Sequence, residues 1–221
     1  MRKKSTCEEI RYKLMIIGDE NVGKTSIINR FKNNQFNPIY EPTVGLDFQS
    51  IPILIDNQTV TLLLYDTAGQ EKFKSLIPLY TNEANIIFFV YDISNLESFQ
   101  NIPKWIDCLN NINRDEVIFG LVGNKCDLDY NRKVSTEEAE KFANDNNFIF
   151  QEVSSLKGEG LQELFLNKLI EQIRTQFIQR GNNIITDQDE EKLKINTTNN
   201  NNKKNNKNIK SKRCCDKCIT F

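Results

Sequence analysis

The eight residues that join a short apolar run to a helical pattern constrain this fold more than any other part of the chain. Lys13 to Ile17 reads as a strand, and a helix is predicted from about Lys24. The segment between them, Gly18-Asp19-Glu20-Asn21-Val22-Gly23-Lys24-Thr25, satisfies the pattern Gly-x4-Gly-Lys-Ser/Thr. Its glycines let backbone N–H groups approach phosphate oxygens, and the positive end of the helix points at them. We therefore predict a phosphate-binding loop, which at this point leaves ATPases and kinases open.

Specific roles follow from the chemistry of this loop. Lys24 is expected to bridge the β- and γ-phosphates of a nucleotide, and the Thr25 hydroxyl is expected to ligate Mg²⁺. The residues predicted to contact the nucleotide here are Gly18, Glu20, Asn21, Val22, Gly23, Lys24, Thr25 and Ser26.

A second segment, Asn124-Lys125-Cys126-Asp127, selects the base. The Asp127 carboxylate can accept hydrogen bonds from N1–H and the 2-amino group of guanine, whereas adenine presents an acceptor there and no donor. A buried polar group left unpaired rejects the wrong ligand by roughly 10⁴-fold. Lys125 is expected to lay its aliphatic stem over the ring, and Asn124 is expected to tie this loop to the phosphate loop. Alone the tetrapeptide is a weak signal, but about 100 residues after a phosphate loop it predicts GTP or GDP as the ligand.

A third segment, Asp66-Thr67-Ala68-Gly69-Gln70, follows a predicted strand. Asp66 is placed to hold Mg²⁺ through water, and Gly69 can donate its N–H to the γ-phosphate. Gln70 both donates and accepts hydrogen bonds, which suits it to orient a water for in-line attack. The alternative is an ordinary polar turn after a core strand.

Alternating strands and helices predict an α/β fold, a six-stranded and mostly parallel sheet with helices on both faces. Strands are expected at Lys13–Ile17, Leu46–Ile55, Thr59–Tyr65, Asn85–Tyr91, Val117–Val122 and Phe148–Glu152, and helices near Leu96–Asn110, Thr136–Asn144 and Leu161–Gln179. Asp56-Asn57 predicts a hairpin turn, and Ser135 with Glu138 predicts a capping box. We divide the chain into an N-terminal extension (1–11), a nucleotide-binding domain (12–180) and an Asn/Lys-rich flexible tail (181–221).

Charge and cysteine content bound the remaining possibilities. From Lys192 onward the chain has nine basic residues and one acid, so this part carries +8 and the rest carries −9 of the net −1. An acidic body with a basic tail favours attraction of the tail to an anionic surface rather than nucleic-acid binding. No histidine is present, which excludes His-based catalytic triads. The polar start of the chain does not resemble a signal peptide, so we expect a cytosolic protein. We also expect it to be a monomer.

Together these segments resemble the Ras superfamily of small GTPases and, within it, the Rab branch of membrane-trafficking GTPases. Val44-Gly45-Leu46-Asp47-Phe48 is similar to the Rab stretch Ile-Gly-Ile-Asp-Phe. Glu71 to Tyr80 resembles the second switch of Rabs, especially those working at the Golgi. The resemblance covers about Tyr12 to Gln179. It implies a P-loop small GTPase fold, slow GTP hydrolysis, and partners comprising an exchange factor, an activating protein and effectors.

The resemblance also assigns roles to individual residues. It implies that Phe36 packs an edge against guanine, that Tyr40 closes over the nucleotide, and that Thr43 is a Mg²⁺ ligand that senses the γ-phosphate. The loop that contacts the guanine oxygen corresponds to Ser154, Ser155 and Leu156. The aromatic trio with which Rabs read effectors corresponds to Phe48, Tyr65 and Tyr80.

Four residues depart from the pattern of the Rab branch. Tyr65 stands where most Rabs have tryptophan, which alters the effector surface. Ser155 and Leu156 replace alanine and lysine, which weakens the expected contacts to the base. Glu20 places a negative charge beside the expected γ-phosphate, where it can slow hydrolysis or repel an inserted arginine.

The C-terminus carries a candidate membrane anchor. Cys218-Ile219-Thr220-Phe221 fits the prenylation pattern, and a final Phe favours geranylgeranyl. One lipid binds membranes only marginally, so a second signal is expected, either the basic run Lys203–Lys217 or a lipid on Cys214 or Cys215. The alternatives are an unmodified tail or a metal-binding one. Lipidation by the prenylation machinery would place the protein on the cytoplasmic face of an internal membrane, with a cytosolic pool.

Three hypotheses follow for the whole chain. The first is a Rab-type GTPase switch that regulates vesicle trafficking, with Gln70 and Lys24 as the catalytic residues. The second is a nucleotide-holding effector scaffold of the same fold that hardly hydrolyses GTP because of Glu20. The third, metabolic phosphotransfer, predicts ATP use and conflicts with Asp127.

Overall fold

The computed structural model describes residues 10–38, 43, 46–67, 77–81, 83–109 and 112–179. The chain divides into two compact units, residues 1–172 and residues 173–221, and only 173–179 of the second unit are described. Among the described residues, no helix is both long and apolar enough to cross a membrane.

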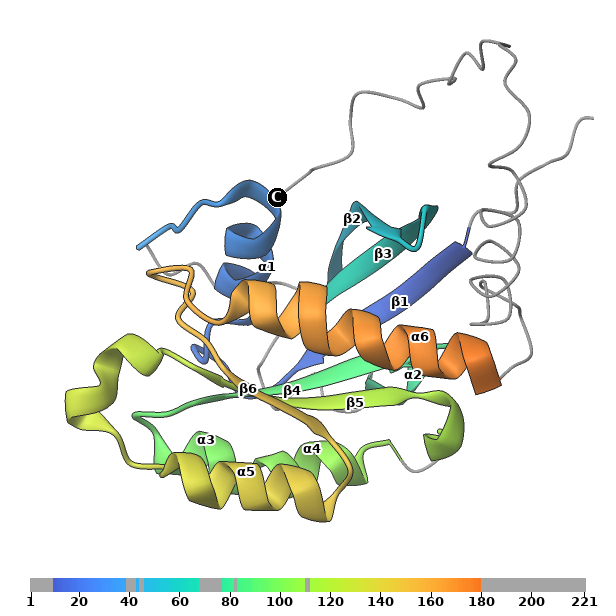
Figure 1. The fold of residues 1–221 in the computed structure, drawn as a ribbon. Coiled ribbons are helices and arrows are strands. Elements are labelled where there is room, and N and C mark those ends of the chain that lie inside the picture. Colours follow the sequence, from blue (N-terminus) through green and yellow to red (C-terminus); the bar gives the residue numbers. More distant parts are fainter. Residues whose placement is uncertain are drawn as a thin grey trace, which may run out of the picture. The chain divides into compact units, whose positions relative to one another are not determined.

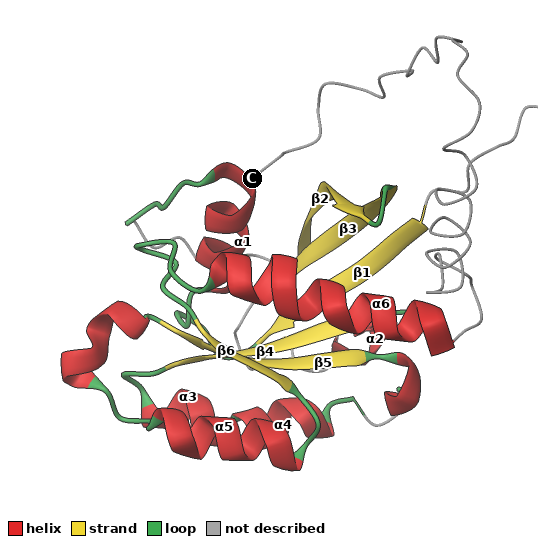
Figure 2. Cartoon of the chain, in the orientation of Figure 1, coloured by secondary structure: helices red, strands yellow, loops and turns green. Residues whose placement is uncertain are grey.

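The centre of the first unit is a six-stranded sheet in the order β2-β3-β1-β4-β5-β6 (Figures 1 and 2). Every neighbouring pair is parallel except the antiparallel hairpin of β2 and β3. This confirms the predicted mostly parallel sheet. The strands are β1 (Ile10–Ile17), β2 (Leu46–Ile55), β3 (Gln58–Thr67), β4 (Ile86–Asp92), β5 (Ile118–Asn124) and β6 (Ile149–Glu152).

Helices cover both faces of this sheet, as predicted. α1 (Lys24–Asn33) lies on one face, and α3 (Leu96–Gln100), α4 (Ile102–Asp107) and α5 (Thr136–Asp145) lie on the other (Figure 1). The short α2 (Ile77–Thr81) precedes β4. A π-helical segment, η4 (Glu163–Lys168), continues into α6 (Leu169–Gln179), and two 3₁₀ segments, η2 (Arg114–Glu116) and η3 (Cys126–Asn131), flank β5.

The core forms where the central strands are covered on both sides. All seven residues of β4 are buried, which explains why the six before Asp92 are apolar or aromatic without alternation. On the side of α3 to α5, buried Tyr91 and Trp105 belong to one apolar cluster with residues of β1 and α5. On the side of α1, Phe165 of η4 stacks on Phe31 with ring centroids 4.0 Å apart. A packed sheet of this kind holds the loops at its strand ends in place.

The local signals agree with the structure in two places and differ in a third. Asp56 and Asn57 form the hairpin turn with positive φ of 48° and 64°, and Ser135 caps α5 by accepting a hydrogen bond from the Glu138 N–H at 3.1 Å. The single helix predicted near Leu96–Asn110 is instead two short helices, α3 and α4, separated at Asn101. Pro103 lacks the N–H that would bond the preceding turn, so one continuous helix cannot form.

Candidate nucleotide-binding site

The phosphate loop connects the end of β1 to the start of α1 and needs glycine at both ends. A Cβ at Gly18 would lie 2.2 Å from the Val90 carbonyl oxygen of β4. Gly23 has φ of 93°, and a Cβ there would lie 2.2 Å from Nδ2 of Asn124. The loop is therefore pressed against β4 on one side and against the candidate base loop on the other.

Lys24 is buried, with 6% of its surface exposed, and its side chain folds back along the loop. Its Nζ donates to the carbonyl oxygens of Gly18 at 3.0 Å and Asp19 at 2.7 Å. Burial lowers the pKa of Lys24 to about 8, while the charges of Asp66, Asp19 and Glu20 oppose that shift. A buried ammonium at a helix N-terminus, bonded to two main-chain carbonyl oxygens, suits a multiply charged anion.

The loop residues between the two glycines differ in exposure. Glu20 and Asn21 are exposed, and Asn21 has a φ of 60°. Val22 is buried and its carbonyl contributes to the contact with the base loop, while Ser26 is half-buried on α1. Glu20 acts on Lys24 through its charge, so the two residues expected beside the γ-phosphate have opposite signs.

Three oxygen-bearing side chains converge beside the phosphate loop. Thr25 Oγ1 donates to Asp66 Oδ2 at 2.5 Å and lies 2.9 Å from Thr43 Oγ1. Thr43 Oγ1 also donates to Asp66 Oδ2, at 3.2 Å. The structure thus brings together the residues predicted to hold Mg²⁺ from three separate segments.

The chemistry of this cluster fits a hard divalent cation. Hydroxyl and carboxylate oxygens are the ligands that Mg²⁺ prefers. Asp66 Oδ1 is buried and has no hydrogen-bond partner among the described residues. Burial raises the pKa of Asp66, opposed by hydrogen bonds from Thr25 and Thr43 and by the charge of Lys24. A buried carboxylate with an unused oxygen is stabilised by a cation bound there.

Asn124, at the end of β5, joins the candidate base loop to the phosphate loop. Its fully buried side chain donates from Nδ2 to the Val22 carbonyl at 2.8 Å. Its Oδ1 accepts a hydrogen bond from the Ser155 N–H at 3.2 Å. The predicted link between the two loops is present, and it extends to a third loop after β6.

Asp127 and Lys125 take different positions in the base loop. Asp127 Oδ1 accepts a hydrogen bond from Ser154 Oγ at 2.5 Å, which orients the carboxylate. Lys125 has a left-handed backbone with φ of 64°, and its Nζ forms an ion pair with Asp92 Oδ2 at 2.7 Å. Asp92 is the last residue of β4 and in turn accepts hydrogen bonds from Ser94. The ion pair with Asp92 therefore fixes the position of the Lys125 ammonium group.

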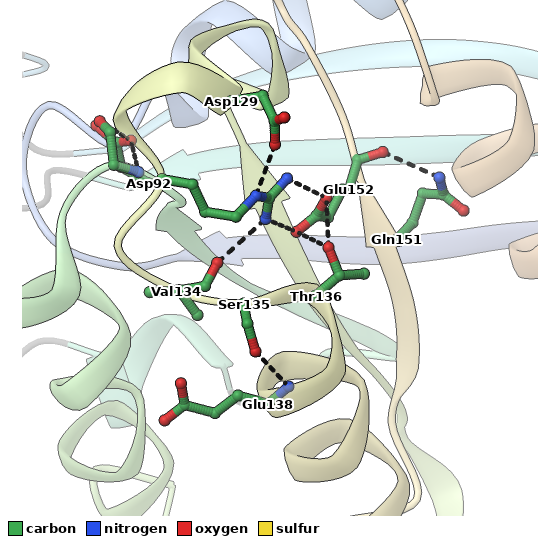
Figure 3. A network of polar contacts seen from close by, with 10 residues as sticks. Asp92, Asp129, Val134, Ser135, Thr136, Glu138, Gln151 and Glu152 are labelled. Atoms are coloured by element: carbon green, nitrogen blue, oxygen red, sulfur yellow. Dashed lines mark hydrogen bonds and ion pairs between the residues drawn. The ribbon is translucent and has the colours of Figure 1, made fainter.

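An ion-pair network joins the base loop, which carries Lys125 and Asp127, to the end of β6, after which Ser154 lies (Figure 3). Arg132, just after η3, donates to both carboxylate oxygens of Glu152, at 2.6 and 2.9 Å. The same guanidinium donates to Asp129 at 2.8 Å and to the Val134 carbonyl at 3.1 Å. Thr136 adds a hydroxyl to Glu152 at 3.3 Å. This bidentate contact fixes the end of the base loop to Glu152 at the end of β6, two residues before Ser154.

The remaining residues assigned to the base lie at the edges of the site. Leu156 is exposed, and its carbonyl oxygen accepts a hydrogen bond from Arg30 of α1. Phe36 is half-buried in the segment after α1. The Ser155 N–H already donates a hydrogen bond to Asn124 Oδ1. Ser154, Ser155 and Leu156 therefore differ in the groups that they contact.

Two of the three aromatic residues assigned to an effector surface are in contact. Phe48 of β2 is 63% exposed and stacks on Tyr65 of β3 with ring centroids 5.9 Å apart. Lys13 Nζ lies 5.0 Å from the centroid of the Tyr65 ring. Tyr80 is half-buried and packs, like Tyr65, against the apolar core. The predicted residues Tyr40, Gly69, Gln70, Cys214, Cys215 and Cys218 lie outside the described residues.

A glycine-rich phosphate loop on a mostly parallel sheet, with a lysine and a threonine at the start of the next helix, defines a P-loop nucleotide-binding protein. Residues 13–175 match the sequence model of the Ras family. Because that match covers more than half of the 221 residues, the chain belongs to the Ras family. It is a small GTPase, which binds guanine nucleotide and acts as a switch that hydrolyses GTP.

Sequence reasoning did not find several residues that support the site. Asp92, Arg132 and Glu152 act through contacts between segments that are distant in the chain, and no local pattern marks them. Asp19 is one of the four unspecified positions of the phosphate-loop pattern, yet its side chain is bonded to residues 82 and 86 positions away.

Proposed function

We propose that this small GTPase is of the Rab type and regulates vesicle trafficking as a membrane-anchored switch. The observation that carries the proposal is the exposed ring of Phe48, which stacks on half-buried Tyr65 and ends a stretch, residues 44–48, whose sequence is similar to that of Rabs. Large exposed aromatic side chains are typical of protein-binding surfaces. A Golgi membrane is the candidate location, on the similarity of Glu71 to Tyr80 to the second switch of Golgi Rabs.

The strand register connects this aromatic pair to the nucleotide site. Phe48 pairs with Tyr65 across β2 and β3, and the next pair is Asp47 with Asp66. The candidate effector surface therefore begins one residue from the metal-site carboxylate. A change at the metal and γ-phosphate would move the backbone on which a partner reads Phe48 and Tyr65.

The mechanism that we propose is positional. Lys24 and the N-terminus of α1 hold positive charge against the phosphates, and Mg²⁺ at Thr25, Thr43 and Asp66 would neutralise further charge as the terminal phosphate leaves. Gln70 orients the attacking water. Unassisted turnover of about 10⁻⁴ s⁻¹ is expected, and an arginine inserted by an activating protein would raise it about 10⁵-fold.

The same contacts define the switch. Thr43 and Gly69 would bond the γ-phosphate, so its loss releases the segments on either side of the metal site. An exchange factor, an activating protein and effectors would act on these segments.

Replacing Gln70 with leucine tests the catalytic assignment. Leucine cannot orient a water, so single-turnover GTP hydrolysis with an activating protein is expected to fall at least about a hundredfold, while GTP binding is retained. The measurement is phosphate release from a stoichiometric complex. An unchanged rate in the variant, with the native chain active, would contradict the role of Gln70.

A second candidate function is a nucleotide-holding effector scaffold that hardly turns over. It is favoured by Glu20, whose charge lies in the phosphate loop and acts on Lys24. In the assay above, equal and negligible rates for the native chain and the Gln70→Leu variant would support the scaffold. A Glu20→Gly variant that gains hydrolysis would show that this carboxylate is the cause.

Membrane anchoring is tested by changing Cys214, Cys215 and Cys218 to serine together. The basic tail alone is expected to bind membranes weakly, so this variant should move to the soluble fraction of cells of its own host. A Cys108→Ser variant is the matched control, because Cys108 lies in the folded unit and has a free thiol. It should remain with membranes. Membrane association of the triple variant at the native level would refute the lipid anchor.

A further inference from the structure

The side chain of Asp19 in the phosphate loop points away from the loop and toward helix α4. Its Oδ2 accepts a hydrogen bond from Asn101 Nδ2 at 2.7 Å. Its Oδ1 accepts one from the indole Nε1 of Trp105, also at 2.7 Å. Both carboxylate oxygens are thus bonded to side chains that lie more than 80 residues further along the chain.

The main chain of the same residue holds the phosphate-binding lysine. The Asp19 carbonyl oxygen accepts a hydrogen bond from Lys24 Nζ at 2.7 Å. One residue therefore links the α3–α4 region, through its side chain, to the ammonium of Lys24, through its backbone. A shift of the carboxylate would move this carbonyl with it.

The partners of Asp19 are themselves held firmly. Trp105 is 1% exposed and belongs to the apolar cluster beneath the sheet. Asn101 stands at the break between α3 and α4, where its N–H and carbonyl bond both helices. Its Oδ1 accepts a hydrogen bond from Lys104 Nζ at 2.7 Å, which continues the connection to the surface of α4.

An acid in a loop that binds phosphates is unfavourable unless its charge is directed elsewhere. The two hydrogen bonds hold the Asp19 carboxylate on the side of α4, so the charge of Asp19, unlike that of Glu20, is directed away from the N–H groups of the loop. Removal of either donor would leave the carboxylate free to turn toward the solvent or the phosphates. In both cases the phosphate loop loses a contact that fixes its position relative to α4.

We propose that Asn101 and Trp105 are positioning residues for nucleotide binding, which hold the phosphate loop through Asp19 and so lengthen the residence time of the bound nucleotide. The inference rests on the phosphate-binding role of the loop. It adds that the junction of α3 and α4, which lies outside the nucleotide-binding motifs of the sequence, controls how tightly the phosphates are held through its contact with Asp19.

The test measures GDP release from the full chain. Asn101→Ala removes one charge-assisted hydrogen bond and is expected to speed GDP release about tenfold. Asn101→Asp places two carboxylates at 2.7 Å and is expected to speed release about a hundredfold. Asn95→Ala is the matched control, because Asn95 caps α3 with the same side chain and lies near the same helices without bonding Asp19. Its release rate should stay native.

A swapped pair provides the rescue. In the double variant Asp19→Asn, Asn101→Asp, the amide now at position 19 can donate to the carboxylate at position 101 and still accept from the Trp105 indole. Release is expected to return to within about threefold of native. A loss caused by poor folding of each single variant would add up in the double variant instead of cancelling.

Two further readouts separate positioning from general destabilisation. Trp105 is the sole tryptophan of the chain, so its emission should change when GDP leaves and should shift in Asp19→Asn. Asn101→Ala should lower the affinity for GDP more than that for GMP, because the base contacts are intact. Native release rates in both Asn101 variants, from a native chain that binds GDP, would overturn the inference alone. A native chain that binds no GDP would overturn the proposed phosphate loop as well.

Discussion

Replacing Asp127 with asparagine is expected to weaken GTP binding at least about a thousandfold and to make xanthosine triphosphate the better ligand. The carboxylate offers acceptors to two donors of guanine, whereas the amide presents N–H groups that match the extra carbonyl of xanthine. Ser154 donates a hydrogen bond to Asp127 Oδ1 at 2.5 Å. This bond fixes the plane of the side chain at position 127, both for the native aspartate and for the asparagine of the variant. The hydroxyl can serve the asparagine oxygen as well as the carboxylate.

The measurement is competition of the two triphosphates for the purified variant. Asp129→Asn is the matched control, because it makes the same change two residues further on, where the side chain is 75% exposed and pairs with Arg132. That control should keep the native preference for GTP. If Asp127→Asn also keeps it, the assignment of the base loop is wrong.

Replacing Lys24 with alanine is expected to lower the affinity for both GDP and GTP at least about a hundredfold. The variant loses the only cation that the described part of the phosphate loop carries, and a buried charge paired with phosphate stabilises strongly. The preference for guanine over xanthine should be unchanged, since the base loop is untouched. Equilibrium titration with labelled GDP and GTP gives both affinities.

The comparison for this variant is Lys32→Ala, which removes the same charge from the last turn of the same helix. Because Lys32 lies at the opposite end of α1, it should bind both nucleotides like the native chain. Equal losses in the two variants would mean that net charge, and not the geometry of the loop, sets the affinity.

The sequence alone predicts those features of the fold and of the site that are determined by residues close to one another in the chain. The phosphate loop, the hairpin at Asp56-Asn57 and the Ser135 cap each follow from short patterns with local physical causes, and the structure has them. Loops that follow parallel strands meet at one edge of the sheet, which is why the predicted contact of Asn124 with the phosphate loop is also present over 102 residues.

The remainder depends on packing that no local pattern encodes. Pro103 explains why the predicted helix breaks at Asn101. What the break makes possible, the contact of the Asn101 side chain with Asp19, is seen only in the structure. Strand β1 begins at Ile10 rather than Lys13, because Ile10 to Tyr12 pair with β3 although their sequence is only partly apolar. The anchoring of Lys125 by Asp92 likewise needs the two strand ends to be side by side.

The ion pair between Arg132 and Glu152 has a consequence for how selectivity is divided. This ion pair and the hydrogen bonds of Asn124 and Ser154 hold the base-binding loops in place through contacts within the protein. The conformational entropy of ordering those loops is therefore lost during folding and not when the nucleotide binds. We expect the base half of the site, preorganised in this way, to bind the di- and triphosphate forms equally well. Discrimination between the two states would then depend on Thr43 and Gly69, the residues proposed to bond the γ-phosphate.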